Sequence, residues 1–174
     1  PWEGTILRAR PPTYEPVEIF ARGLRNTFGL AIGPDGELFG TDNDSQSGAI
    51  AHFGDKLIEI QEGDDFGHPY AAPGSPDVTP PMDISKFALA GVAVSHDAEL
   101  SETYRRSLFV VSYGEGRILR YELDSDTTSR PRKAKAHPFA VVPAATDIAA
   151  APDGDFYVIS YENRTLYRIR RKRS

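Results

Sequence analysis

The chain of 174 residues is long enough to bury a core of its own, and 40% hydrophobic with 26% charged residues is typical of a globular domain. Its formal net charge of −5 argues against a nucleic-acid or anionic-membrane partner, because both attract basic surfaces. The absence of cysteine excludes disulfides, a thiolate nucleophile and a covalently attached c-type haem. No apolar run reaches the roughly 18 residues of a membrane-spanning helix.

Three segments of the chain are built on one plan, a short apolar strand followed by a second strand of alternating apolar residues. The first strands start at Gly29, Gly91 and Asp147, and a third strand follows each pair. A P-D-G turn joins the two strands in the first and last copies, at residues 34–36 and 152–154. We therefore predict a repeated antiparallel unit of three to four strands.

The third-strand pattern also occurs before the first copy, at residues 6–10, so the chain opens in the second half of a unit. The sequence predicts an all-β fold, a β-propeller of four-stranded antiparallel blades. A β-sandwich is the alternative, but it does not explain the repeat. We expect the end of one blade, a blade with a long loop, a further blade, and three strands of a last one. The corresponding residue ranges are 1–24, 25–90, 91–146 and 147–174.

About three blades are present, which is half of a six-bladed ring and too few for closure. An open half-ring leaves two blade faces and two strand edges bare. We therefore expect the remaining blades to come from the same polypeptide or from another chain. Alternate strand residues are predicted to point into the packing between blades; they are Leu30, Ile32, Val92, Val94, Phe109, Val111, Ile148, Tyr157 and Ile159.

Two longer motifs carry a family resemblance. Residues 23–36, GLRNTFGLAIGPDG, and residues 63–70, GDDFGHPY, resemble motifs of the glucose/sorbosone dehydrogenase family, with Thr27 where that family has proline. The resemblance implies a six-bladed propeller that oxidises sugars or aldehydes with pyrroloquinoline quinone (PQQ) and calcium. It also implies a small-molecule sugar or aldehyde substrate and a periplasmic or secreted location.

The resemblance also implies which residues would hold these groups. Arg25 and Asn26 occupy the cofactor-contacting positions, and a guanidinium suits a carboxylate-rich quinone. Calcium takes oxygen ligands, and the family's loop after the second strand supplies carbonyl groups, here near Asp44 and Ser45. Asp42 and Asp44 could add side-chain oxygens. Alternatively, Arg25 and Asn26 are a structural pair that holds the start of a strand against a neighbouring loop, and residues 42–44 are a solvated turn.

Other positions depart from the family pattern. The family's general base is a histidine of an earlier blade, outside this chain, so we predict no catalytic residue here. A lysine of the family falls at Gly114, and two arginines fall at Ala144 and Thr146. Without these three cations, much of the charge complementarity for a tricarboxylate is absent.

Three functions therefore remain open from the sequence. The first is part of a PQQ- and calcium-dependent dehydrogenase, and the second is a non-catalytic propeller that scaffolds or binds a partner. The third is a calcium-dependent, lactonase-like hydrolase, with Asp42, Asn43 and Asp147 as candidate metal ligands. In each case the ligand should lie where the residues before the first strand of a hairpin meet those after its second strand. Because the two strands are antiparallel, we predict Arg25 and Asp44 on one face and the P-D-G turns on the other.

Overall fold

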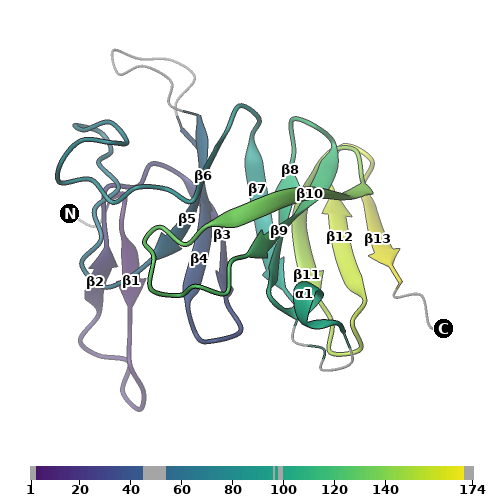
Figure 1. Cartoon of the computed structure of the whole chain (residues 1–174), viewed down its shortest axis with the longest axis horizontal. Coiled ribbons are helices and arrows are strands. Elements are labelled where there is room, and N and C mark those ends of the chain that lie inside the picture. The colour runs from purple at the N-terminus through teal and green to yellow at the C-terminus, as the bar shows by residue number, and fades with distance from the viewer. Residues whose placement is uncertain (1–2, 45–53, 96, 98–99, 171–174) are drawn as a thin grey trace.

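The computed structural model describes residues 3–44, 54–95, 97 and 100–170, and these form four antiparallel sheets side by side (Figure 1). The sheets contain two, four, four and three strands, in chain order. The first two sheets consist of β1 (Ile6–Arg8) and β2 (Glu18–Ala21), then β3 (Thr27–Ile32), β4 (Leu38–Asp42), β5 (Asp55–Ile60) and β6 (Asp83–Ser85). The third and fourth consist of β7 (Leu89–Val94), β8 (Ser107–Ser112), β9 (Arg117–Leu123) and β10 (Ala134–Val141), then β11 (Ala145–Ala150), β12 (Phe156–Ser160) and β13 (Thr165–Ile169). This confirms the prediction of an all-β chain with four-stranded antiparallel blades, about half of a six-bladed propeller.

A short helix, α1 (Glu102–Arg105), precedes β8. Within the described part of the chain, no helix has the length and apolar character needed to cross a membrane. The two fourth strands, β6 and β10, were not apparent as strands in the sequence. Their side chains are mostly half-buried or exposed, so they lack the apolar alternation that marks the inner strands.

Each innermost strand carries an irregularity at the same place. The pairing register shifts between Thr27 and Gly29 in β3, between Leu89 and Val92 in β7, and between Ala145 and Asp147 in β11. At these points neighbouring inner strands approach closely. A Cβ atom on Gly29 would lie 3.2 Å from the Cα of Gly91, so a larger residue at Gly29 would push the two strands apart. The repeat therefore begins at the position that sets the spacing between blades.

The hydrophobic core is divided into clusters that lie between neighbouring sheets. One cluster joins Phe39 and Leu57 of the second sheet to Val92 and Val94 of the third. The next joins residues of the third sheet to the fourth, and the other lies between the first sheet and the outer strands of the second. The cluster between the third and fourth sheets consists of Ala90, Ala93, Phe109, Val111, Ile118, Val142, Ala145, Ile148, Phe156 and Val158. The cluster between the first and second sheets consists of Ala21, Leu24, Ile58, Ile60 and Phe66. Blade-to-blade contact is thus the main source of apolar burial.

The packing prediction holds for Val92, Val94, Phe109, Val111 and Ile148, which are at most 6% exposed, and Tyr157 is half-buried. It was wrong for three residues at the two ends of the row of sheets. Leu30 and Ile32 are 49% and 56% exposed, and Ile159 is 51% exposed. The first two face the space beside the two-stranded first sheet, and Ile159 lies on the outward face of the last sheet. Among the residues that the structure describes, no complete blade packs over either face.

Replacement of Val94 or Ile148 by alanine should lower the free energy of unfolding by about 1–4 kcal/mol, since each leaves a cavity between two sheets. Ile32→Ala is the matched control, because Ile32 occupies the equivalent of the Val94 position but is 56% exposed. Urea unfolding of the three variants tests this. A loss for Ile32→Ala as large as that for Val94→Ala would show that burial between sheets does not govern these positions.

A buried arginine joins the second and third sheets. Arg132, in the β9–β10 connection, is 1% exposed and forms an ion pair with Glu37 at the start of β4. Its backbone N–H donates to Glu59 Oε2 at 3.2 Å, and its Nε donates to the Asp124 carbonyl at 2.8 Å. A loop of one blade is therefore anchored in the neighbouring blade by buried charge.

A second polar contact links the same two sheets. The Tyr121 hydroxyl of β9 donates to Asp83 Oδ2 of β6 at 2.8 Å. Burial, together with the Asp83 carboxylate, raises the pKa of the Tyr121 hydroxyl well above its ordinary value. The neutral phenol is thus favoured in the folded state.

We expect stability to fall as the pH rises above about 10, where the Tyr121 phenol ionises in the unfolded chain but stays protonated in the folded one. Below pH 10 the phenol is neutral in both the folded and the unfolded state, so its full contribution to the free energy of unfolding is present there. Urea unfolding at pH 8 to 11 should show a steeper decline for the wild type than for Tyr121→Phe. Parallel declines would contradict this assignment.

Candidate functional site

The antiparallel order of the strands separates two edges of the sheets. The turns between β3 and β4 and between β11 and β12 lie at the lower edge in Figure 1, whereas β4 and β12 end at the upper edge. We call this upper edge, where β4, β8 and β12 end, the mouth. Asp35 of the first turn pairs with Arg106, 3.5 Å away, while Arg25 contacts the residues that follow β4. The predicted separation of the P-D-G turns from Arg25 and Asp44 is confirmed.

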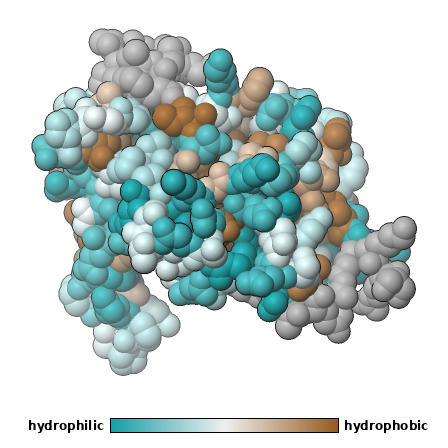
Figure 2. Space-filling view, viewed as in Figure 1, coloured by the Kyte–Doolittle hydropathy of each residue, from teal (hydrophilic) through white to brown (hydrophobic). Residues whose placement is uncertain are grey.

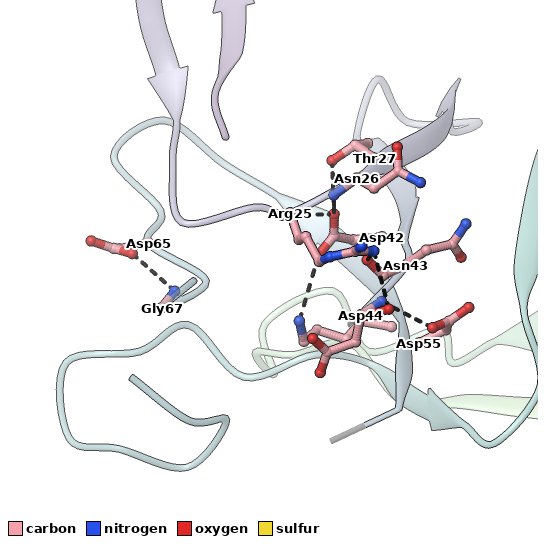
Figure 3. Close-up of polar contacts among 10 residues, drawn as sticks. Arg25, Asn26, Thr27, Asp42, Asn43, Asp44, Asp55, Asp65 and Gly67 are labelled. Atoms are coloured by element: carbon pink, nitrogen blue, oxygen red, sulfur yellow. Dashed lines mark hydrogen bonds and ion pairs between the residues drawn. The ribbon is translucent and has the colours of Figure 1, made fainter. Parts of the chain in front are cut away.

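Asp42 organises the mouth of the second sheet (Figure 3). Its carboxylate is fully buried, and Oδ1 accepts the backbone N–H groups of Arg25 at 3.1 Å and Asn26 at 2.9 Å. The Thr27 hydroxyl lies 3.3 Å from the same oxygen, and the buried Lys56 ammonium lies 3.5 Å from Oδ2. These contacts fix the segment before β3 against the end of β4.

The side chains of Arg25 and Asn26 are exposed at this edge. Arg25 Nη1 donates to the carbonyl oxygens of Asn43 at 3.2 Å and Asp44 at 3.1 Å, and the Asn43 N–H donates to the Asn26 carbonyl. The guanidinium therefore lies over the backbone of the 42–44 turn (Figure 3). It is a positioned cation at the mouth, with an amide side chain beside it.

Asp55, at the start of β5, completes this network. Its carboxylate accepts the N–H groups of Asp44 at 2.9 Å and Leu89 at 3.0 Å, so it links the turn to β7 of the next sheet. Burial raises the pKa of the Asp55 carboxyl despite these two donors. Sequence reasoning missed Asp55 and Lys56, although their place at the start of the third strand, opposite the end of the second, was a usable signal.

Among the described residues near Asp42, few oxygen atoms could bind a metal ion without rearrangement of the hydrogen bonds that they already accept. A metal ion would compete with the four groups that already contact the Asp42 carboxylate, and with Arg25 at the Asn43 and Asp44 carbonyls. Among the described residues, no group of three or more histidine or acidic side chains is arranged to hold a metal. Ser45, the remaining predicted metal residue, lies outside the described residues.

The third and fourth sheets present different groups at the mouth. The Tyr113 hydroxyl donates to Glu162 Oε1 at 2.9 Å, which raises the pKa of the Tyr113 hydroxyl, and the Ser112 hydroxyl lies 2.9 Å from Glu115 Oε2. Gly114 falls between these residues. Carboxylates and phenols thus stand beside a position where the family carries a lysine.

The two resemblance motifs form one structural unit. The N–H groups of Phe66 and His68 donate to the carbonyls of Arg22 and Gly23, each at 2.9 Å. Gly23 has a φ of +75°, and a Cβ there would lie 2.7 Å from the Phe66 nitrogen, so glycine is required for this approach. Asp65 accepts the Gly67 N–H at 3.0 Å (Figure 3). The 63–70 loop is thereby held against the segment that leads to Arg25.

A surface cavity of about 750 Å³ lies between these motifs and extends to Arg25. His68 and the largely exposed Tyr70 line one side, and Leu24 and Asp77 also contribute. An aromatic side chain, an imidazole and a guanidinium next to a concave surface can hold a small polar ligand. The sequence motif predicted the loop but not this cavity.

The sheets and their order define an incomplete β-propeller, with Arg25 and the surface cavity at one end of its blades. The family model of the glucose/sorbosone dehydrogenases matches residues 3–168, and the chain belongs to this family. No protein of curated function matches the chain by sequence.

Solved structures support the fold. The PQQ-bound aldose sugar dehydrogenase of Streptomyces coelicolor matches with a TM-score of 0.66 at 19% identity, over 90% of this chain and 46% of that one. The apo-form soluble aldose sugar dehydrogenase of Escherichia coli gives 0.64 at 18% identity, over 89% and 50%. A calcium structure of a family AA12 carbohydrate-active enzyme of Trichoderma reesei gives 0.59 at 11% identity, over 86% and 53%. The chain therefore spans about half the length of the proteins that it matches.

Proposed function

We propose that the chain forms part of a PQQ- and calcium-dependent dehydrogenase of sugars or aldehydes, with Arg25 and Asn26 contacting the quinone. The observation that carries this proposal is the Asp42 network, which holds Arg25 and Asn26 at the mouth with exposed side chains. A guanidinium and a side-chain amide fit the carboxylate and carbonyl oxygens of such a quinone.

When bound, the quinone would accept a hydride from the substrate, and calcium would polarise the quinone. The residues of this chain hold the site in place. Asp42 orients the segment that carries Arg25, and Asp55 fixes the 42–44 turn against β7. Arg25 fits the quinone, whereas calcium at the Asp44 carbonyl would stand beside the guanidinium that already donates to that oxygen. We assign no general base to this chain, and we place the whole protein in the periplasm or outside the cell.

The test is titration of the complete protein with PQQ and calcium, monitored by quinone absorbance and by dye reduction with sugars. Arg25→Ala should weaken quinone binding roughly tenfold or more, since it removes a charge-assisted hydrogen bond. Arg168→Ala is the control, because Arg168 is an exposed arginine that pairs with Asp155 beside the β11–β12 turn, at the edge opposite the mouth. Absence of both spectral change and turnover would exclude the dehydrogenase function.

A non-catalytic binding propeller is the second candidate, and the chemistry of the third and fourth sheets favours it. Glu115, Glu162 and Tyr113 stand near the mouth, where Gly114, Ala144 and Thr146 supply no cation. Carboxylates accept hydrogen bonds from neutral hydroxyl groups but repel a tricarboxylate. Sugar binding by calorimetry, without any quinone binding, would support this candidate over the dehydrogenase.

A further inference from the structure

A surface cavity of about 540 Å³ lies on the third sheet, where α1, the end of β9 and the start of β10 meet (Figure 1). We call it the β10 cavity. Its walls are mostly charged, and they include Glu102, Arg106, Glu122, Asp124, Lys133, Lys135 and His137. Figure 2 shows mainly hydrophilic residues over this part of the molecule, in the lower middle of the view. The functions proposed above make no use of this cavity.

The position of the β10 cavity separates it from the mouth. Since α1 precedes β8, which ends at the mouth, the cavity lies at the opposite edge of the sheets. The third sheet packs against a neighbour on each side, through Val92 and Val94 toward the second sheet and through Phe109 and Val111 toward the fourth. Blades added at the ends of the row would therefore leave the cavity open.

Three basic side chains of the cavity come from alternate residues of one strand segment. Lys133 directly precedes β10, and Lys135 and His137 lie within it. Alternate residues of a strand point to the same side of the sheet, which is why all three line the cavity. Arg106, at the end of α1, adds a guanidinium. The cavity thus has basic groups from two separate elements.

The backbone that carries these groups is fixed against the end of β9. The Asp124 N–H donates to the Lys133 carbonyl and the Leu123 N–H donates to the Arg106 carbonyl, each at 2.9 Å. The buried Arg132 side chain donates to the Asp124 carbonyl at 2.8 Å and so anchors the same segment. A site whose backbone is already ordered loses less entropy when a ligand binds.

Two carboxylates beside these cations are engaged elsewhere. Glu122 Oε2 lies 3.3 Å from Arg120 Nη2 and 3.4 Å from His137 Nε2. Asp124 Oδ1 accepts the backbone N–H of Asp126 at 3.0 Å. Neither carboxylate therefore forms an ion pair with a lysine of the cavity.

The two lysines keep their positive charge free. Both are exposed, and no carboxylate of the described residues pairs with either, although Lys135 stands opposite Glu122 in the register of β9 and β10. Arg106 is loosely paired, since its Nη1 lies 3.5 Å from Asp35 Oδ2. Glu102 of α1 is exposed, likewise without an ion pair in the described part of the chain. The β10 cavity therefore combines free positive charge with one free carboxylate.

We propose that the β10 cavity binds the phosphate monoester of a small polyol, such as a sugar phosphate. Lys133, Lys135 and Arg106 surround the phosphate, because ammonium and guanidinium groups form charge-assisted hydrogen bonds with its oxygens. Glu102 accepts a hydrogen bond from a hydroxyl group of the polyol. The carboxylates of the cavity and the net charge of −5 disfavour a longer polyanion such as a nucleic acid.

The experiment is calorimetric titration of the full chain, without quinone, with glucose 6-phosphate and inorganic phosphate as probes. We expect glucose 6-phosphate to bind more tightly, since only this probe offers hydroxyl groups to Glu102. Lys135→Gln should weaken its binding about tenfold, through loss of a charge-assisted hydrogen bond. Lys86→Gln is the matched control and should leave binding unchanged, because Lys86 is an exposed lysine that follows β6, away from the cavity.

A second variant tests the contact with the polyol. Glu102→Ala removes the free carboxylate, which repels inorganic phosphate but accepts a hydroxyl group of glucose 6-phosphate. The preference for glucose 6-phosphate over inorganic phosphate should therefore fall roughly fivefold. Equal affinities of the unmodified chain for the two probes, or an unchanged preference in Glu102→Ala, would overturn the assigned ligand.

Imidazole NMR spectra locate the bound probe. Glucose 6-phosphate should shift the ring signals of His137, assigned by their loss in His137→Gln, and leave those of His68 at the mouth unchanged. A shift of His68 alone, equal weakening by Lys86→Gln and Lys135→Gln, or no binding of glucose 6-phosphate would overturn the proposal. Failure of the complete protein to bind quinone would not, because the two sites lie at opposite edges and are titrated separately.

Discussion

Replacement of Arg132 by methionine should lower the free energy of unfolding by about 3–5 kcal/mol, because removing one partner of a buried ion pair leaves the other charge uncompensated. The partner is Glu37, and the loss also frees the Asp124 carbonyl from its hydrogen bond with Nε. The backbone N–H that Arg132 donates to Glu59 is retained in the variant, so the loss reports the guanidinium alone. Urea denaturation measures the effect.

Arg130→Met is the matched control for this prediction. Arg130 lies two residues earlier and pairs with Asp64 at 2.9 Å, but its side chain is 33% exposed. Exposed pairs contribute roughly 0–1 kcal/mol. The double variant Arg132→Met with Glu37→Gln should recover part of the loss, since no charge then remains unpaired at that point. Equal losses for Arg130→Met and Arg132→Met would contradict the assignment of Arg132 as the anchor between the blades.

Asp42→Ala should be about as damaging, again about 3–5 kcal/mol, because it leaves the buried Lys56 ammonium without its counter-charge. The N–H groups of Arg25 and Asn26 lose their acceptor in the same step. We therefore expect lower stability together with faster amide exchange at residues 25–27. The measurement is made without calcium, so that it reports the network itself.

Two further variants separate the charge from the hydrogen bonds. Thr27→Val replaces only the hydroxyl at 3.3 Å by a methyl group, and should cost roughly 0.5–1.5 kcal/mol. Asp42→Ala combined with Lys56→Met should be less unstable than Asp42→Ala alone, since the buried cation is gone. If Asp42→Ala lowered stability only in the presence of calcium, Asp42 would be a metal ligand instead of the organiser of the turn.

The inner strands could be predicted from the sequence because their signals are local. A P-D-G turn and alternating apolar residues are sufficient to mark β3, β4, β11 and β12. The same local pattern cannot show which face has a neighbour. Leu30 and Val92 look alike in sequence, yet only Val92 is buried, because burial depends on the preceding blade.

The candidate site was predictable in position but not in chemistry. Arg25 precedes β3 and Asp44 follows β4, so the antiparallel direction of the two strands predicts both residues at one edge of the sheet. The role of Asp42 could not be read in the same way, because its donors are backbone N–H groups 16 and 17 residues away. Such groups are present at every residue except proline, so no side-chain pattern marks the ones that meet a buried carboxylate.

The division of the core into separate clusters between sheets has a consequence for how the chain loses its structure. With nearest-neighbour contacts only, stability is the sum of the contributions of each sheet and each junction, as in a one-dimensional array. Unfolding should then begin at the ends, with β11–β13 and β1–β2 opening before the two central sheets. Asp42, Lys56 and Asp55 belong to the second sheet, and their link to Leu89 reaches the third. The order around Arg25 is therefore held by the two sheets that open last.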